Sequence, residues 1–107
     1  MFSGPLSQLA EAVQGSWYGE DVVCQGVTTD TRTLQPGVLF VALKGPRFDG
    51  HDFIEQAIQG GAAAVLVEQP LVSDFPHIVV AHVEEAFLQL ASYWRSQHPA
   101  DAVAVTG

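Results

Sequence analysis

The chain has 107 residues, with 4 lysines and arginines against 12 acidic residues and a formal net charge of −8. The length predicts a single domain, and 48% hydrophobic against 15% charged residues gives it enough apolar surface for a packed core. The acidic balance argues against a nucleic-acid partner, because the phosphate backbone is bound through lysines and arginines. Cys24 is the single cysteine, so an internal disulfide is excluded and a reducing compartment is favoured.

The sequence carries no sign of a membrane-directed segment. No apolar run approaches the length of a membrane span, and the first residues lack the basic and then apolar pattern of a secretion signal. We therefore expect a cytoplasmic protein with no membrane partner.

The first part of the chain predicts one helix followed by strands. Apolar residues over 6–13 recur at helical spacing, which predicts a short helix with Gly15 at its C-terminal cap. Residues 17–29 are rich in β-branched and aromatic types and predict one or two strands. The Gln-Pro-Gly sequence at 35–37 fits a type II turn, and the apolar run at 38–43 predicts a central strand covered on both faces.

A loop and a helix are expected to follow that strand. Residues 44–51 contain two glycines, one proline and two cations, which predicts a loop at the carboxyl end of the strand. Asp52 is expected to cap a helix with Phe53 on its apolar face, and the two glycines at 60–61 to end it. The apolar run at 62–67 predicts a second buried strand, reached by a right-handed crossover. The later predicted elements are a short strand at 77–81, a helix at 84–97 and a last strand at 102–105.

These elements predict an α/β fold with a mixed, mostly parallel sheet of about five strands flanked by helices. We expect Phe40 and Phe53 to lie in its core. Ligands of such folds bind at the loops that follow the carboxyl ends of the strands. Three of the four cations, Arg32, Lys44 and Arg47, belong to the loops expected at that edge. His77, His82 and His98 lack the spacing of metal ligands, so no metal site is expected.

Four ordered blocks resemble the N-terminal domain of the Mur ligases. They are Thr-Asp-Thr-Arg at 29–32, Pro-Gly-Val-Leu-Phe-Val-Ala-Leu-Lys-Gly at 36–45, Arg-Phe-Asp-Gly-His-Asp-Phe-Ile at 47–54, and Gly-Ala-Ala-Ala at 61–64. The resemblance implies that residues 1–107 form the UDP-binding domain. It also implies that Thr106 and Gly107 begin the ATP loop of a central domain, although a strand that merely ends there would look the same.

The resemblance further implies the reaction of the whole ligase. ATP converts the peptide carboxylate of the substrate into an acyl phosphate, which an amine then attacks. In the branch of the family that the blocks match best, the substrates are UDP-N-acetylmuramoyl-tripeptide and D-alanyl-D-alanine, used in peptidoglycan synthesis. ATP and Mg²⁺ belong to the central domain, so the 107-residue chain is expected to hold no catalytic residue and to lack ligase activity. We also expect a monomer.

In this family the first domain holds the UDP end of the substrate. Uracil needs polar groups at its edge and an apolar surface against its ring, whereas a diphosphate needs cations or free backbone N–H groups. The threonines can supply the first, Pro46 and Phe48 the second, and Arg32 or Arg47 the third. The residues that the resemblance assigns to this end are Thr29, Thr31, Arg32, Lys44, Gly45, Pro46, Arg47, Phe48, Asp49 and His51.

Other interpretations of the same residues stay open at this point. Asp30 and Arg32 can form a salt bridge that only fixes the loop, and residues 49–52 can be a turn and helix cap. For the whole chain, one alternative is the same domain of the ligase that adds the third peptide residue. Another is a freestanding α/β interaction module with no nucleotide partner.

Overall fold

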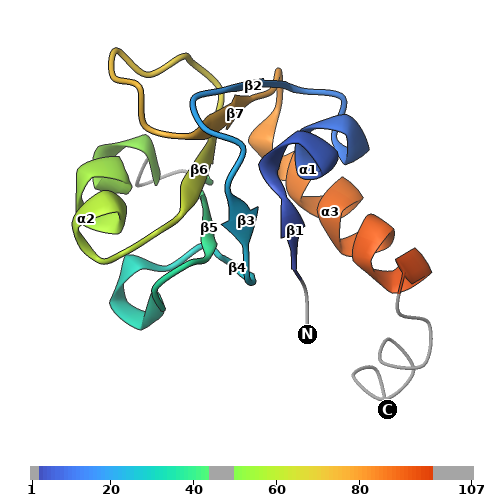
Figure 1. Ribbon diagram of the computed structural model, residues 1–107, viewed down its shortest axis with the longest axis horizontal. Coiled ribbons are helices and arrows are strands. Elements are labelled where there is room, and N and C mark those ends of the chain that lie inside the picture. The colour runs from blue at the N-terminus through green and yellow to red at the C-terminus, as the bar shows by residue number, and fades with distance from the viewer. Residues whose placement is uncertain (1–2, 44–49, 98–107) are drawn as a thin grey trace.

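The computed structural model describes residues 3–43 and 50–97, which form two sheets and three α-helices (Figure 1). The main sheet has five strands in the order β2-β7-β6-β5-β4, and β4 to β7 are parallel while β2 is antiparallel to β7. This confirms the predicted fold class. The strands of this sheet are β2 (Ser16–Tyr18), β4 (Val27–Thr28), β5 (Leu39–Val41), β6 (Ala64–Val67) and β7 (His77–Val79).

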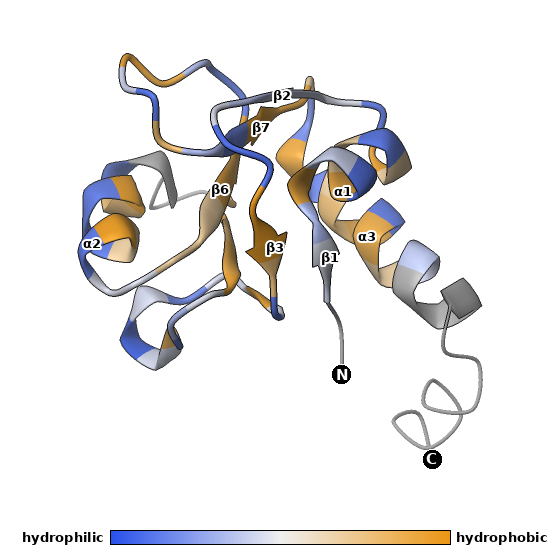
Figure 2. Ribbon diagram, viewed as in Figure 1, coloured by the Kyte–Doolittle hydropathy of each residue, from blue (hydrophilic) through white to orange (hydrophobic). Residues whose placement is uncertain are grey.

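Helices cover both faces of the main sheet, as expected for parallel strands that are apolar throughout. Alternate residues such as Leu39 and Leu66 pack with α1 (Leu6–Ala12) and α3 (Val83–Gln97), while Phe40 and Val65 pack with α2 (Ile54–Gln59). Figure 1 shows α1 and α3 on one side of the strands and α2 on the other. Figure 2 shows the hydrophobic residues concentrated on the strands and on the helix faces towards them.

Residues 17–29 contribute to three short strands rather than the one or two predicted. Gly19 and Gly26 have positive φ angles of 86° and 138° and separate β2, β3 (Val23–Cys24) and β4. The middle strand leaves the main sheet and pairs with β1 (Gly4–Pro5) in a two-stranded sheet.

The end of α1 differs from its prediction. Gln14, with φ 56°, is the left-handed residue that follows the C-cap Val13, and its N–H donates to the carbonyl of Glu11. The N–H of Gly15 donates to the carbonyl of Ala10 at 2.9 Å, which completes a Schellman motif. Gly15 is therefore not the left-handed residue; a Cβ there would lie 2.8 Å from the backbone oxygen of Val79, so the position needs glycine for close packing.

The start of α2 also differs. Gly50–Phe53 form a 3-10 turn, η2, and the N-cap of α2 is Phe53, with no side-chain hydrogen bond to the helix. The prediction that Asp52 caps this helix was wrong. Gly60 is the C-cap, which confirms the predicted end.

The third helix, α3, begins one residue earlier than predicted. The N–H of its first residue, Val83, donates to the Glu68 carboxylate at 3.0 Å, which joins the helix to the end of β6. Over residues 3–43 and 50–97, no helix combines the length and the apolar character needed to cross a membrane. The strand predicted at 102–105 lies outside the described residues.

Asp21 anchors the first turn of α1, and this contact makes a testable contribution to stability. Its two carboxylate oxygens accept the backbone N–H of Ser7 at 2.8 Å and the Ser7 hydroxyl at 2.7 Å. The backbone N–H of Ser7, followed by its hydroxyl, holds the pKa of Asp21 below its usual value. A lowered folded-state pKa stabilises the fold above the unfolded-state pKa, and that contribution is lost as the pH falls through the folded-state pKa.

We therefore expect Asp21→Asn to lower the urea midpoint at neutral pH and to differ progressively less from the unchanged chain on acidification. Urea melts at a series of pH values test this. In a Ser7→Ala background the same substitution should have a smaller effect, because its partner hydroxyl is gone. A difference that stays constant down to the acid end would contradict the assignment.

Candidate functional site

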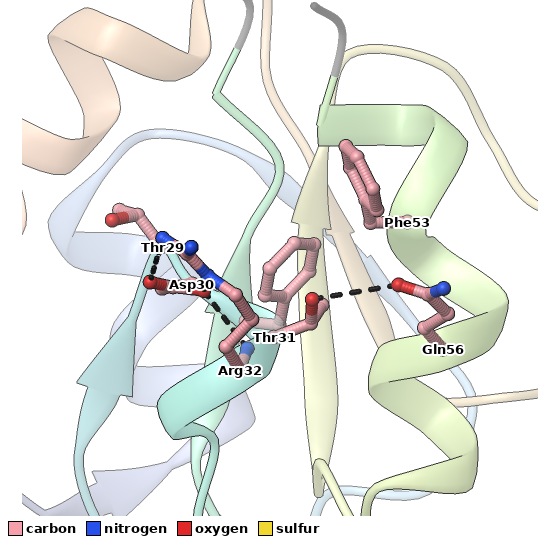
Figure 3. Close-up of a pocket in the computed structure, with 7 residues that line it drawn as sticks. Thr29, Asp30, Thr31, Arg32, Phe53 and Gln56 are labelled. Atoms are coloured by element: carbon pink, nitrogen blue, oxygen red, sulfur yellow. Dashed lines mark hydrogen bonds and ion pairs between the residues drawn. The ribbon is translucent and has the colours of Figure 1, made fainter.

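A pocket of about 490 Å³ opens at the edge of the main sheet where β4 and β5 end. Residues 29–32 directly follow β4, and Phe40 comes from β5. The remaining walls come from η2 and α2, on the other side of the pocket (Figure 3). The lining residues are Thr29, Asp30, Thr31, Arg32, Phe40, Phe53 and Gln56.

Asp30 organises the loop after β4. It is the N-cap of the 3-10 turn η1 (Thr31–Thr33), and its Oδ1 accepts the backbone N–H of Arg32 at 2.8 Å. The same carboxylate accepts hydrogen bonds from Nε and Nη2 of Arg32, both at 3.1 Å. The salt bridge between Asp30 and Arg32 that the sequence left open is therefore present. The Arg32 side chain, and then its backbone N–H, hold the pKa of Asp30 below its usual value; Asp30 in turn raises the pKa of Arg32.

A polar contact connects the two sides of the pocket. The Thr31 hydroxyl lies 3.5 Å from Oε1 of Gln56, on α2 (Figure 3). Gln56 was not among the residues predicted for the site. It follows Phe53 by three residues, but nothing in the sequence marks it as a pocket residue, because Phe53 lies in the 3-10 turn before α2 rather than in the helix.

Two aromatic side chains form the apolar part of the pocket, but they are not equivalent. Phe40 is 1% exposed and belongs to the core, as predicted. Phe53 is 37% exposed, so its prediction as a core residue was wrong. Its position in the 3-10 turn before α2 directs the ring to the pocket (Figure 3).

The structure brings Thr29, Thr31 and Arg32 together in this pocket. Of the other residues predicted for the UDP end, Lys44, Gly45, Pro46, Arg47, Phe48 and Asp49 lie outside the described residues, and His51 is described only in its backbone. Thr106 and Gly107 are also outside them. Among the described side chains, no group of three histidine, cysteine, aspartate or glutamate residues could hold a metal ion.

Comparison with known proteins identifies the class. The model of the family described as "Mur ligase family, catalytic domain" matches residues 23–95, and the chain belongs to the Mur ligase family. The UDP-N-acetylmuramoyl-tripeptide--D-alanyl-D-alanine ligase of Escherichia coli (strain K12) is 52% identical over 107 residues, which is all of this chain and 24% of that protein.

Solved structures agree with this assignment. A crystal structure of MurF from Acinetobacter baumannii has a TM-score of 0.78 at 35% identity, covering 88% of this chain and 22% of the other. MurF ligase from Thermotoga maritima, solved in complex with ADP, has a TM-score of 0.61 at 32% identity, covering 68% of this chain and 17% of the other. The chain thus spans about a quarter or less of the proteins it matches, and the family match favours a ligase domain over an interaction module.

Proposed function

We propose that this chain is the domain that holds the UDP end of UDP-N-acetylmuramoyl-tripeptide in a ligase that adds D-alanyl-D-alanine. One observation carries the proposal: the resemblance assigns Thr29, Thr31 and Arg32 to the UDP end, and these residues line one pocket at the ligand-binding edge of the sheet. The 52% identity to a ligase named for these substrates supports it. The remaining predicted residues, at 44–49 and His51, are proposed to complete the site.

The pocket suits a nucleoside diphosphate. Its volume of about 490 Å³ falls in the range of small-molecule sites, about 300–1,000 Å³. The half-exposed ring of Phe53 offers an apolar surface for a planar base, and the hydroxyl of Thr31 and the carboxamide of Gln56 offer polar groups for its edge. Arg32, whose side chain is 87% exposed, offers N–H donors for a phosphate.

The amide-forming step is proposed to take place outside this chain. ATP supplies the phosphoryl group that activates the peptide carboxylate, and the ADP in the T. maritima ligase supports a nucleotide site in the family. We propose that ATP and Mg²⁺ are held by a central domain and that the whole ligase is a cytoplasmic monomer. The role proposed for this chain is to bind and orient the UDP end of the substrate, without ligase activity of its own.

The proposal is tested by titrating the isotope-labelled chain and following backbone amide shifts. UDP-N-acetylmuramoyl-tripeptide, UDP and uridine should move the amides of residues 29–32 and of Gln56, whereas ATP should leave them in place. If millimolar UDP moves nothing in the folded chain, or if ATP moves the same amides as UDP, the proposed function is wrong.

A further inference from the structure

The guanidinium of Arg32 is held from one side. Its Nε donates a hydrogen bond to Oδ1 of Asp30, and its Nη2 donates one to Oδ2, both at 3.1 Å. A guanidinium has five N–H donors, so this side-on pairing leaves three of them uncommitted to Asp30. The side chain is 87% exposed, so those three donors are open to solvent, and Arg32 is one of the residues that line the pocket.

Asp30 is itself held in place by hydrogen bonds, so it can hold the Arg32 side chain in one orientation. Its N–H donates to the Thr28 hydroxyl oxygen at 3.2 Å, and its own carboxylate accepts the Arg32 backbone N–H at 2.8 Å. Thr28 belongs to β4, whose pairing with β5 ties the loop to the sheet. An exposed arginine without such a partner would sample many rotamers, and ordering them on binding would cost affinity.

The pocket has two chemically different ends. Arg32 lies on the η1 side, whereas Phe53 and Gln56 lie on the α2 side (Figure 3). A nucleoside diphosphate is likewise divided into an uncharged planar base and a charged diphosphate. An aromatic ring and a carboxamide suit the base, and an oriented guanidinium suits the diphosphate.

We propose that Asp30 is a positioning residue, which holds Arg32 so that its remaining N–H donors meet the diphosphate of the ligand. This inference rests on the proposed function and deepens it. Asp30 touches no phosphate itself, and its negative charge partly offsets that of Arg32. Its contribution is therefore orientation of hydrogen bonds rather than added positive charge.

The test compares UDP with uridine, because only UDP carries the diphosphate. The dissociation constants of both ligands are measured for the unchanged chain and for Arg32→Ala, Asp30→Ala and the double variant. Arg32→Ala should weaken UDP binding about tenfold and uridine binding less than twofold, as expected for charged hydrogen bonds. Asp30→Ala should weaken UDP binding about threefold, a typical worth of an exposed ion pair, again with little change for uridine.

The double variant shows whether Asp30 acts through Arg32. It should bind UDP no more weakly than Arg32→Ala alone. Asp74→Ala is the matched control. It removes the same charge from an exposed carboxylate that precedes β7, at the amino ends of the parallel strands, whereas the pocket lies at their carboxyl ends. It should leave both dissociation constants unchanged. The ¹⁵Nε signal of Arg32 should move with UDP but not with uridine.

The outcomes separate the two proposals. If UDP and uridine bind but Asp30→Ala leaves their affinity ratio unchanged, or strengthens UDP binding, Asp30 does not position Arg32 and the proposed function stands. If Asp30→Ala weakens UDP binding in the Arg32→Ala background as well, its effect is not exerted through Arg32 and the inference is also wrong. If neither UDP nor uridine binds the folded chain, the proposed function fails and the inference fails with it.

Discussion

Replacing Gly19 by alanine is expected to lower the free energy of unfolding by about 2–5 kcal/mol, because two costs combine at this position. Its φ of 86° is left-handed, which costs an L-residue about 1–2 kcal/mol. A Cβ would also lie 2.7 Å from the backbone oxygen of Asp74 and 2.9 Å from Cα of Pro76. Neither contact can be relieved by rotating a side chain, so the crowding should cost a further 1–3 kcal/mol, approximately.

Gly37 provides the matched control for this prediction. Its φ of 88° is nearly the same, but the nearest atom to its Cβ would be the Gln25 side-chain oxygen, an ordinary contact at 3.9 Å. Gly37→Ala should therefore lose only the backbone cost of about 1–2 kcal/mol. Chemical denaturation of both variants measures the difference. Equal losses in the two variants would show that the chain around Asp74 and Pro76 moves away without cost.

The sheet could be predicted because its signal is local. The apolar runs at 38–43 and 62–67 contain β5 and β6, and both strands are buried on both faces as predicted. The assignments at 17–29 were less accurate because pairing there is decided by distant residues. β3 pairs with β1, whereas β2 pairs with β7 as the last strand of the main sheet, and all of its residues are exposed.

Of the residues that line the candidate pocket, the resemblance named for the UDP end only those that directly follow a strand. Thr29, Thr31 and Arg32 do so after β4, and the carboxyl edge of a parallel sheet is where ligands bind. Gln56 stands 25 residues from its partner Thr31, so their contact depends on where α2 packs. Phe53 shares a helical spacing with Ala57, which suggested a core position. The 3-10 turn at Gly50–Phe53 breaks that periodicity and leaves the ring partly exposed.

Truncation of the two phenylalanines of the pocket should affect different properties: stability for Phe40 and uridine binding for Phe53. Phe40→Ala empties a fully buried position between β5 and α2, and we expect it to cost about 3–5 kcal/mol of stability. Phe53→Ala should cost only about 1 kcal/mol, because the ring is 37% exposed. Loss of the aromatic surface should nevertheless weaken uridine binding about tenfold, within the range of stacking between a base and an aromatic ring.

Thermal unfolding and uridine titration of the same two variants test this contrast, with Phe40→Leu as a milder change if Phe40→Ala does not fold. Phe75→Ala is the control. Its ring is half-buried against the core residues that include Phe40 and Val65, but it precedes β7 and so lies at the amino ends of the parallel strands, away from the pocket. It should lower stability and leave uridine affinity unchanged. Should Phe53→Ala destabilise the chain as much as Phe40→Ala while uridine still binds normally, Phe53 would be a core residue after all, and the base would have to be held by other residues. The proposed function requires the reverse, because only a ring that is not committed to the core can exchange its contact with water for contact with a base.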